Sequence, residues 1–316
     1  MSVRIGIVGG RGYTGAELLK LIAGHPGMTL AFASSSSQAG LPLRSACAEW
    51  PEPSDEFVEL NVHSVASQSA DAWVLAVPNG AAAGWARAIQ DACPDAVVLD
   101  LSADHRFDKD WVYGLPERFR NKLTGARRIA NPGCYATGSQ LALWPLAQRL
   151  SGTPQVFGVS GYSGAGKTPS PKNDPERLAD NLIPYSLAGH VHEHEVSYQL
   201  GRDVRFMPHV AAFFRGISLT VSATLTEGST ADALLDEFQQ FYRAEPMVEV
   251  TPDIPEVSTV RNRPVCRLGG FTADERDQRR ITLVSVLDNL AKGAATQAIQ
   301  NLNLALGLPE TQGLET

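Results

Sequence analysis

The sequence predicts an α/β fold in which a doubly wound parallel sheet is followed by a second domain of α+β type. In the first part of the chain, short β-branched runs alternate with helical stretches, a pattern typical of parallel sheets. From about residue 155, strand-like runs are joined by long connections, which indicates a mixed or antiparallel sheet. The length of 316 residues is enough for two such domains.

The expected second, third and fourth strands are bounded by Pro, Gly or Asp. In the first domain we expect strands at residues 4–8, 28–33, 72–77 and 96–101, and a helix at residues 16–22. In the second we expect strands at residues 156–160, 217–225 and 281–287. A last helix, at about residues 293–306, is rich in Ala and Leu and is expected to pack back on the first domain. The expected domains are therefore residues 1–133 with 293–316, and residues 134–292.

Composition restricts the classes of function. There are 27 Lys and Arg against 34 Asp and Glu, a net charge of −7, which argues against a protein that binds nucleic acid through its phosphates. No apolar run approaches the roughly 18 to 20 residues that span a bilayer, and the N-terminus has no signal-peptide pattern, so we expect neither membrane insertion nor secretion but a cytoplasmic protein. The cysteines are scattered, without a C-x-x-C pair, which predicts neither a disulfide framework nor a metal site.

A glycine-rich turn follows the first expected strand. Gly9, Gly12 and Gly15 lie between that strand and a helix, and Gly10 gives an overlapping G-x-G-x-x-G. Such a turn lets the backbone approach a pyrophosphate, whose charge the helix N-terminus stabilises. A tight turn without a ligand is the alternative, but the position at the first strand of a doubly wound sheet favours a Rossmann-type dinucleotide site.

The end of the second expected strand favours NADP(H) over NAD. An NAD site usually has a carboxylate there for the ribose 2′-hydroxyl. This chain has four serines, including Ser34 and Ser35, and then Gln38. A 2′-phosphate would meet no like charge, although no arginine stands in the run to bind it.

Cys134 is the candidate nucleophile. It follows Pro132-Gly133 and opens an apolar helix, where the helix dipole lowers a thiol pKa and backbone N–H groups can stabilise an oxyanion. A buried, inert cysteine is the alternative, and it is the interpretation for Cys47, Cys93 and Cys266.

A thiolate nucleophile needs a proton partner, which is most often histidine. Four of the seven histidines fall between residues 190 and 209. The run from His190 to Glu195 also resembles a metal cluster if it forms a strand, since alternate imidazoles would share one face. No fixed further ligand is evident, so we expect no metal. A solvated polar turn is the remaining alternative.

Residues 161–168 match the phosphate-loop pattern G-x-x-x-x-G-K-[ST] in full. A phosphate loop requires a helix that begins at the Lys-Thr pair. Pro169 and Pro171 follow at once and disfavour a helix there. We therefore expect a glycine-rich loop near an active site, with Lys167 available to an anion, rather than an ATP site.

Taken together, these segments resemble the N-acetyl-gamma-glutamyl-phosphate reductase family, semialdehyde dehydrogenases of arginine biosynthesis. The resemblance runs along the whole chain. Residues 132–137 are similar to the family's P-G-C-Y-P-T, and Gly133 distinguishes them from the aspartate-semialdehyde dehydrogenases, which more often carry Asn there. Residues 163–166 are similar to S-G-A-G. Residues 190–195 resemble H-R-H-x-P-E, with Val191 and His194 as departures.

The resemblance implies roles for particular residues. Cys134 and His190 fall on the nucleophile and the acid/base histidine. The cofactor positions, together with Ser34 and Ser35 from the reasoning above, are Gly9, Gly12, Tyr13, Thr14, Gly15, Pro78 and Asn289. The expected substrate positions are Ser102, Arg106, Ser163, Glu195 and Arg215. Arg106, Lys167 and Arg215 are the candidate cations for the phosphate and the α-carboxylate.

The expected reaction is NADPH-dependent reduction of N-acetyl-L-glutamyl 5-phosphate, through a Cys134 thioester, to the 5-semialdehyde and inorganic phosphate. A related dehydrogenase acting on aspartyl phosphate, or on a carrier-bound aminoadipyl or glutamyl phosphate, would use the same chemistry. An NADP-sensing regulator would keep the glycine turn without needing Cys134. The family also implies a homodimer or homotetramer, assembled through the sheet of the second domain, which would be the catalytic and dimerisation domain.

Overall fold

The computed structural model describes residues 2–314, which form two compact units. Among the described residues, the first contains residues 2–133 together with residues 294–314. The second is Cys134–Gly293. Each carries its own sheet and core, and each is described by itself below.

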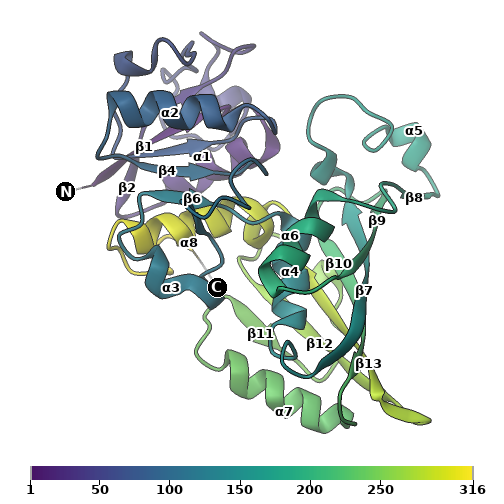
Figure 1. Ribbon diagram of the computed structural model, residues 1–316. Helices are drawn as coiled ribbons and strands as arrows, with labels where there is room; N and C mark the ends of the chain where they lie inside the picture. Colours follow the sequence, from purple (N-terminus) through teal and green to yellow (C-terminus); the bar gives the residue numbers. More distant parts are fainter. Residues whose placement is uncertain (1, 315–316) are drawn as a thin grey trace. The chain divides into compact units, whose positions relative to one another are not determined.

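The first unit is built on a six-stranded sheet in the order β2-β1-β3-β4-β6-β5, with every neighbouring pair parallel (Figure 1). Its strands are β1 (Val3–Val8), β2 (Met28–Ser34), β3 (Ala72–Leu75), β4 (Val97–Asp100), β5 (Val112–Tyr113) and β6 (Arg128–Ala130). Its helices are α1 (Tyr13–Ala23), α2 (Ala82–Ala92), α3 (Pro116–Leu123) and α8 (Thr296–Ala305), with 3₁₀ turns η1 (Leu43–Ser45) and η2 (Val65–Ser67). Strands β3 and β4 are buried along their whole length, and β1 is buried from Ile5 to Val8, as expected for a sheet covered on both faces.

Helices cover both faces of this sheet. Figure 1 shows α2 on one side and α8 on the other. Trp73 of β3 is fully buried on the α2 side, where its ring meets Phe32 edge-on with 4.8 Å between centroids. On the other side, α1 packs against α8. The predicted doubly wound parallel sheet is therefore confirmed.

Helix α8 is held by buried amide side chains as well as by apolar packing. The Asn301 amide donates to the Gly114 carbonyl oxygen (2.9 Å) and to Asn131 Oδ1 (3.0 Å). Gln297 Nε2 donates to the same Gly114 oxygen (2.8 Å). These bonds connect a C-terminal helix to the turn after β5 and to the residue that follows β6. The last helix therefore packs within the first unit.

The second unit is built on a seven-stranded mixed sheet in the order β11-β12-β13-β10-β7-β9-β8. Its strands are β7 (Leu150–Gly161), β8 (Leu182–Pro184), β9 (Arg205–Ala211), β10 (Ile217–Leu225), β11 (Val248–Val250), β12 (Cys266–Asp274) and β13 (Asp277–Leu287). Its helices are α4 (Cys134–Leu143), α5 (Pro175–Leu178), α6 (Val191–Leu200) and α7 (Ala231–Tyr242), with short helical turns η3 (Tyr162–Ala165) and η4 (Val257–Val260). The helical turn η5 (Ala291–Ala295) contains the point along the chain where the second unit ends, after Gly293. Two pairs, β7 with β9 and β11 with β12, are parallel, and the other pairs are antiparallel.

The two faces of this sheet differ. Helices α4 and α7 lie on one face, where the Tyr242 hydroxyl of α7 donates to the Leu141 carbonyl oxygen of α4 (2.6 Å). On the opposite face Val286 is buried in a cluster with Val260 of η4, whereas Phe157, Thr220 and Val284 stay exposed or half-buried. These three are cross-strand neighbours on β7, β10 and β13. The second unit thus leaves one face of its sheet uncovered by α4 and α7.

Several elements differ from expectation. Strand β7 begins at Leu150, not at 156, because its first half pairs with the end of β10. Strands β9 and β12 were not predicted, since β9 contains Pro208 and β12 contains a Gly pair. The run that begins at His190 is neither a strand nor a polar turn, because Val191 opens helix α6. The imidazoles therefore do not alternate on one strand face, which removes the geometric basis of a metal cluster.

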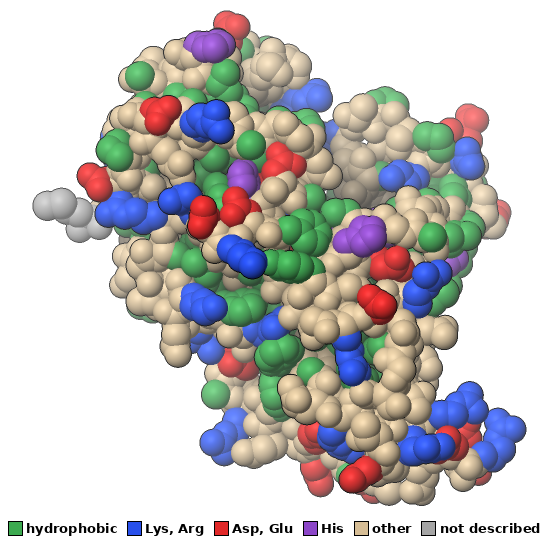
Figure 2. Space-filling view, in the orientation of Figure 1, with side chains coloured by type: hydrophobic (Ala, Val, Ile, Leu, Met, Phe, Trp, Pro, Cys, Tyr) green, Lys and Arg blue, Asp and Glu red, His purple; other side chains and the backbone are tan. Residues whose placement is uncertain are grey.

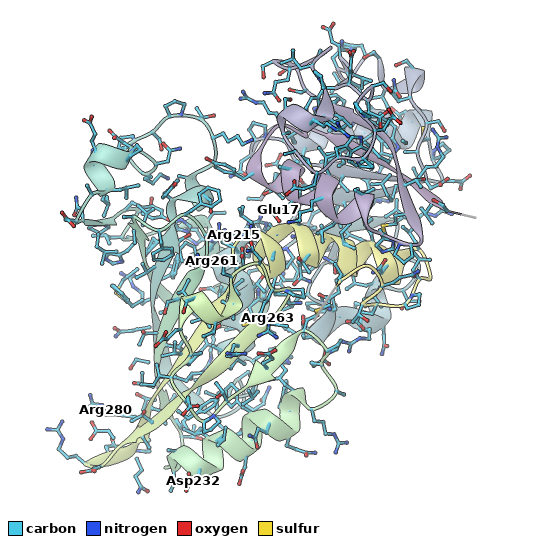
Figure 3. All side chains as sticks on the ribbon, turned by 180° about the vertical axis from the view of Figure 1, so that it is seen from behind. Glu17, Arg215, Asp232, Arg261, Arg263 and Arg280 are labelled. Carbon is cyan, nitrogen blue, oxygen red and sulfur yellow. The ribbon has the colours of Figure 1, made fainter. Side chains whose placement is uncertain are left out.

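Charged side chains of both signs are mixed on the face in Figure 2. At the tip of the β12–β13 hairpin, where Figure 3 labels Arg280, the arginines pair with neighbouring carboxylates. Arg280 lies 3.1 Å from Asp274, and Arg279 lies 2.9 Å from Asp277. None of the helices among residues 2–314 is long and apolar enough to cross a membrane.

The amide bonds of α8 give a first test. Asn301→Ala leaves the Gly114 oxygen with one donor fewer and opens a buried gap, so we expect the free energy of unfolding to fall by about 2 kcal/mol. Urea denaturation followed by circular dichroism measures this. The matched control, Asn121→Ala, changes an exposed asparagine on α3 and should stay within about 0.5 kcal/mol of the wild type. Equal stability of the two variants would contradict a structural role for Asn301.

Candidate active site

The glycine turn has the geometry of a dinucleotide cradle. A Cβ on Gly15 would lie 2.2 Å from the Gly10 carbonyl oxygen, and one on Gly9, whose φ is +86°, would lie 2.4 Å from that of Ala76. Around Gly12, by contrast, an added Cβ would meet open space. The close packing at Gly9 and Gly15 fixes the turn between β1 and α1. The open space at Gly12 leaves the backbone of the turn accessible to a ligand. This is the combination that close approach of a pyrophosphate requires.

The start of α1 fits an anion. Gly12 is its N-cap residue and has no side chain to occupy the first amide groups, and the first turn has no acidic residue. The positive end of the helix is therefore left to an external negative charge. Tyr13 and Thr14 are the first two helical residues.

The end of β2 fits NADP(H) better than NAD. Ser34 and Ser35 are buried there, and the Ser34 carbonyl oxygen accepts hydrogen bonds from the Gly9 (3.1 Å) and Gly10 (2.9 Å) amides. The Ser35 hydroxyl accepts from the Gln38 amide (3.2 Å). The serine run thus closes onto the glycine turn without bringing a carboxylate to it. A phosphate on the ribose would meet hydroxyls and backbone there, not a like charge.

Two turns at the carboxyl ends of β3 and β4 are bonded together. The Asp104 carboxylate accepts from the Gly80 (2.6 Å) and Ala82 (2.9 Å) amides, and Asn79 Oδ1 accepts from the Ala103 amide (3.0 Å). Pro78 belongs to the first of these turns, and Ser102, buried and bonded to Asp100 Oδ2 (2.9 Å), belongs to the second. In doubly wound sheets, ligands bind at this edge.

Cys134 occupies the first position of α4, a helix whose other residues are all buried. Glycines make this position possible. A Cβ on Gly138 would lie 2.6 Å from side-chain atoms of both Leu219 and Leu287, so α4 rests directly on β10 and β13. A Cβ on Gly293 would lie 2.8 Å from the Cys134 Cβ. Cys134 itself is partly exposed, in contrast to Cys47 and Cys266, which are buried.

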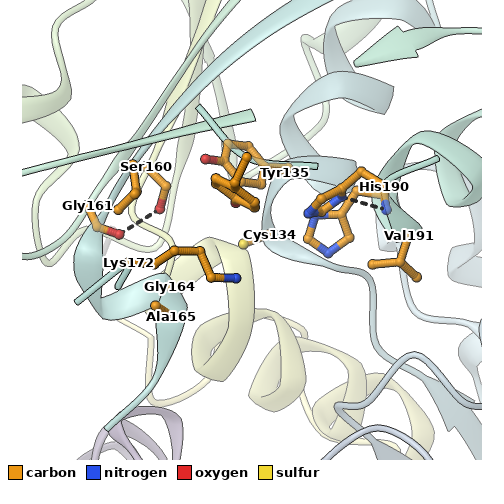
Figure 4. Close-up of a pocket in the computed structure, with 12 residues that line it drawn as sticks. Cys134, Tyr135, Ser160, Gly161, Gly164, Ala165, Lys172, His190 and Val191 are labelled. Carbon is orange, nitrogen blue, oxygen red and sulfur yellow. Dashed lines mark hydrogen bonds between the residues drawn. The ribbon is translucent and has the colours of Figure 1, made fainter. Parts of the chain in front are cut away.

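Cys134 opens into a cavity of about 160 Å³ (Figure 4). The lining residues come from α4, the end of β7 with the following turn, the 166–190 segment, the start of α6, and β9. They are Cys134, Tyr135, Ser160, Gly161, Gly164, Ala165, Lys172, Tyr185, His190, Val191, His192 and Val210. The structure therefore brings the predicted nucleophile and the predicted acid/base histidine together in one cavity of the second unit.

His190 is enclosed by aromatic rings. Its ring centroid lies 4.9 Å from that of His192, 5.3 Å from Phe206 and 5.6 Å from Tyr185. Burial among them, reinforced by the positive charge of Lys172, lowers the pKa of His190 from 6.5 to about 4, although Glu193 acts in the opposite direction. His190 is therefore neutral near pH 7. Because its folded pKa is below the unfolded value, its contribution to stability is complete above pH 6.5 and declines as the pH falls toward 4.

The start of α6 also fixes the tautomer of His190. The residue is the N-cap of this helix, and its Nδ1 accepts a hydrogen bond from the His192 amide (3.1 Å), drawn as a dashed line in Figure 4. An acceptor nitrogen carries no proton, so neutral His190 bears its hydrogen on Nε2. Protonation at Nδ1 would break the cap.

Glu193 holds the segment that carries His190. It is buried, and its two oxygens accept from the Gly189 (3.1 Å) and Phe206 (2.8 Å) amides. The same carboxylate therefore ties the residue before His190 to strand β9. No sequence pattern indicates this role, because the bond to Phe206 joins residues 13 apart along the chain.

The expected substrate residues lie elsewhere than the cavity wall. Ser163 and Glu195 are buried, and neither is among the lining residues. Arg215, labelled in Figure 3, precedes β10 and its Nε donates to Asp288 Oδ2 (2.6 Å). Arg106 is in the first unit, where its guanidinium donates to the Asn131 and Leu101 carbonyl oxygens (3.0 Å each). Their contacts with substrate stay predictions.

Asn289 connects three segments of the second unit. Its Oδ1 accepts from the Gly216 amide (2.7 Å) and its Nδ2 donates to the Ser163 hydroxyl (2.9 Å). The side chain therefore anchors the η3 turn and the start of β10 beside the end of β13. Its predicted place beside the nicotinamide is not tested by these bonds.

The phosphate-loop pattern does not form a phosphate loop. After Gly161 the chain makes the short turn η3, and the next helix, α5, begins at Pro175. Lys167 and Thr168 therefore do not open a helix, as the two prolines predicted. In the part of the chain that the structure describes, no group of three or more His, Cys, Asp or Glu is placed to hold a metal ion.

Sequence reasoning missed three lining residues: Tyr135, Tyr185 and Lys172. The Tyr135 hydroxyl donates to the His209 carbonyl oxygen (2.8 Å), and burial raises the pKa of Tyr185 to about 12, so this phenol stays protonated. Lys172 lies in a proline-rich run that the sequence marked only as incompatible with a helix. The sequence pattern that could have indicated a phosphate-binding lysine is a lysine next to a glycine-rich turn. That pattern indicated Lys167, which directly follows the turn, and not Lys172.

Glu193 gives a second test. Glu193→Gln removes the charge that raises the pKa of His190, so we expect that pKa to fall further below 4. It also leaves a single oxygen for two amide donors, which should lower the free energy of unfolding by about 1 kcal/mol. NMR titration of the protein with ¹³C-labelled histidine measures the first effect and urea denaturation the second. The exposed carboxylate Glu227, changed to Gln, is the matched control, and a pKa that moves equally in both variants would contradict the local effect.

Comparisons with known proteins identify the family of this chain. The family model of the semialdehyde dehydrogenase NAD binding domain matches residues 4–126, and that of the dimerisation domain matches residues 134–289. An N-acetyl-gamma-glutamyl-phosphate reductase from Stenotrophomonas maltophilia is 53% identical over 97% of this chain and 96% of its own length. One from Xanthomonas campestris is 51% identical over the same shares.

Solved structures show the same fold at lower identity. An aspartate semialdehyde dehydrogenase II from Vibrio cholerae, complexed with ASA, has a TM-score of 0.78 at 19% identity and covers 97% of this chain and 99% of its own. An aspartate semialdehyde dehydrogenase with NADP from Candida albicans has a TM-score of 0.73 at 14% identity, over 96% and 99% of the two chains. By its matched domains and its half-identical relatives, the chain belongs to the semialdehyde dehydrogenases, within the N-acetyl-gamma-glutamyl-phosphate reductase family.

Proposed function

We propose that this chain reduces N-acetyl-L-glutamyl 5-phosphate with NADPH to N-acetyl-L-glutamate 5-semialdehyde and inorganic phosphate, in arginine biosynthesis. The observation that carries the proposal is the cavity of the second unit, where a partly exposed cysteine at a helix N-terminus shares a wall with two imidazoles and a lysine. The relatives that share half of its residues are named for this substrate. A cytoplasmic location fits this role.

In this proposal, cofactor binding and catalysis belong to different units. We propose the residues up to 133, with those from 293 on, as the NADP-binding domain, and residues 134–292 as the catalytic and dimerisation domain. Gly9, Gly12, Tyr13, Thr14 and Gly15 would hold the pyrophosphate, Ser34 and Ser35 the ribose side. Pro78 and Asn289 would lie at the nicotinamide. Bound there, NADPH supplies the hydride that reduces the acyl group.

Cys134 begins the reaction as a thiolate. Its sulfur attacks the acyl carbon, a carbon–sulfur bond forms, and the carbon–oxygen bond to the phosphate breaks, so that phosphate leaves with the electron pair. The positive end of α4 lies at the sulfur, and it favours the thiolate before attack and the negative charge that develops on the carbonyl oxygen. The product of this step is a thioester on Cys134.

His190 serves the later proton transfers. After reduction, the carbonyl oxygen of the thioester carries a negative charge, and collapse of that adduct breaks the carbon–sulfur bond and releases the aldehyde. Neutral His190 presents Nε2–H as a hydrogen-bond donor to this oxygen or to the departing sulfur. Transfer of the Nε2 proton requires Nδ1 to take up a proton as the His192 cap opens. In the reverse direction His190 is the base.

The substrate test is spectrophotometric. Purified protein, N-acetylglutamate 5-semialdehyde and NADP⁺ should form NADPH when inorganic phosphate is present and not without it. A phosphate-dependent signal with aspartate semialdehyde but not with the acetylated aldehyde would keep the chemistry and overturn the substrate. Absence of a signal with both aldehydes would overturn the reductase proposal.

Replacement of the nucleophile separates catalysis from cofactor binding. Cys134→Ala removes the sulfur that forms the thioester, so we expect turnover to fall by at least about 10³-fold. NADPH binding, followed by nicotinamide fluorescence, should be unchanged. Cys93→Ala, which changes a partly exposed cysteine of the first unit, is the control and should keep full activity. Substantial residual activity in Cys134→Ala would contradict the thioester.

We also propose that the chain forms a homodimer or homotetramer through the uncovered face of the second sheet. The matched family model describes this region as a dimerisation domain. Phe157 is 38% exposed at the centre of that face, against the ring of His209 at 4.4 Å. An exposed aromatic ring flanked by half-buried side chains is typical of a surface covered in an assembly.

Light scattering after size exclusion tests the assembly. The wild type should have two or four times the 33.9 kDa of one chain. Phe157→Glu, which places a charge on the face, should shift the protein toward 33.9 kDa, while Phe241→Glu, on an exposed aromatic of α7, should not. A monomeric wild type, or a Phe157 variant that remains assembled, would contradict the proposal.

A further inference from the structure

The cavity beside Cys134 contains a single strongly basic side chain, that of Lys172. Among its twelve lining residues there is no arginine, aspartate or glutamate. An acyl phosphate or inorganic phosphate that enters this cavity brings two negative charges or nearly so. Such a group needs a cationic partner where water is displaced, and Lys172 is the one that the wall supplies.

Lys172 is held in place by its neighbours. The Asn173 amide donates to the Gly166 and Thr168 carbonyl oxygens (2.8 Å each), and its Oδ1 accepts from the Ser170 amide (2.7 Å). The Ser170 hydroxyl in turn accepts from the Lys172 amide (3.3 Å). The backbone that carries Lys172 is therefore tied to the glycine-rich turn that forms another part of the cavity wall.

The side chain is directed as well. Its Nζ lies 4.7 Å from the centroid of the Tyr185 ring, a cation–π contact, and Figure 4 shows the ammonium pointing toward the Cys134 sulfur. Tyr185 is itself part of a small core with Leu178, Ile183 and Val210, which fixes the ring. The lysine is half-buried rather than extended into solvent.

The other candidate cations either bond to other groups or lie away from the cavity wall. Arg215 is ion-paired with Asp288, whose side chain is fully buried. Arg106 donates to two backbone carbonyl oxygens of the first unit. Lys167 is exposed and is not among the lining residues. By contrast, the ammonium of Lys172 faces an aromatic ring and the cavity.

We infer that Lys172 binds the phosphoryl group of the acyl phosphate, and inorganic phosphate in the reverse reaction, beside the Cys134 sulfur. The inference rests on the proposed function, and it names the residue that binds the leaving group of the proposed reaction. The phosphoryl group is joined through one bridging oxygen to the carbon that Cys134 attacks, so it must lie close to the sulfur, where the ammonium points. The α-carboxylate lies at the far end of the glutamyl chain.

Lys172 transfers no proton in this role. The carbon–sulfur bond forms, the carbon–oxygen bond breaks, and the electron pair goes to phosphate, whose added negative charge the ammonium stabilises. The same positive charge favours the Cys134 thiolate before attack. When Lys172 is neutralised, both effects are lost, while the sulfur and the imidazoles remain.

The test compares Lys172→Met with Lys172→Arg. In the phosphate-dependent oxidation of the semialdehyde, the Met variant should raise the KM for phosphate by about tenfold or more, and the Arg variant by much less. The KM for NADP⁺ should not change in either. Arg177→Met, which removes an exposed cation from α5 in the same segment, is the matched control. An unchanged KM for phosphate in Lys172→Met would overturn the inference and leave the proposed function intact.

A second readout does not depend on turnover. Inorganic phosphate should slow alkylation of Cys134 by iodoacetamide in the wild type and in Arg177→Met, as followed by mass spectrometry of the Cys134 peptide. It should give no protection in Lys172→Met. Equal protection in both would overturn the inference even if no aldehyde is a substrate.

Discussion

The second unit depends on the burial of α4. Nine of its ten residues are buried, and the tenth is Cys134. The helix can lie this close to the sheet because Gly138 has no side chain at the point where Leu219 and Leu287 approach. A buried helix of this kind cannot shift without opening the core, so its N-terminus stays fixed. The position of the sulfur is thus determined by packing that is remote from any substrate.

His190, the proposed proton-transfer residue, is also positioned by its packing and hydrogen bonds. Three features position His190. It is the N-cap residue of α6, aromatic rings surround it, and Glu193 bonds both to the preceding glycine and to β9. These contacts also determine its charge. Burial and Lys172 lower the pKa of His190, and Glu193 limits the effect, so position and protonation state have a common structural cause.

The first unit shows a different arrangement. Its ligand-binding features are mostly backbone: the cradle of glycines, the uncapped start of α1, and the two turns joined by Asp104. Side chains there act on the backbone more than on a ligand. This is why the turn could be recognised from glycine spacing, since spacing along one segment decides where the backbone can approach an anion.

The features that could be predicted from the amino-acid sequence are local ones. The alternation of strands and helices, the glycine turn, and a cysteine after Pro-Gly at a helix start each depend on neighbours along the chain, and the doubly wound sheet and the α+β second unit followed from them. Features that depend on residues far apart along the chain became apparent only in the folded structure. It showed that the His190 run is a helix start rather than a strand. It tied Arg215 to Asp288, 73 residues away, and brought Lys172 rather than Lys167 to the wall of the cavity. The physical reason is that a side chain's partners, burial and charge are set by segments that meet only after folding, and no spacing within one segment encodes them.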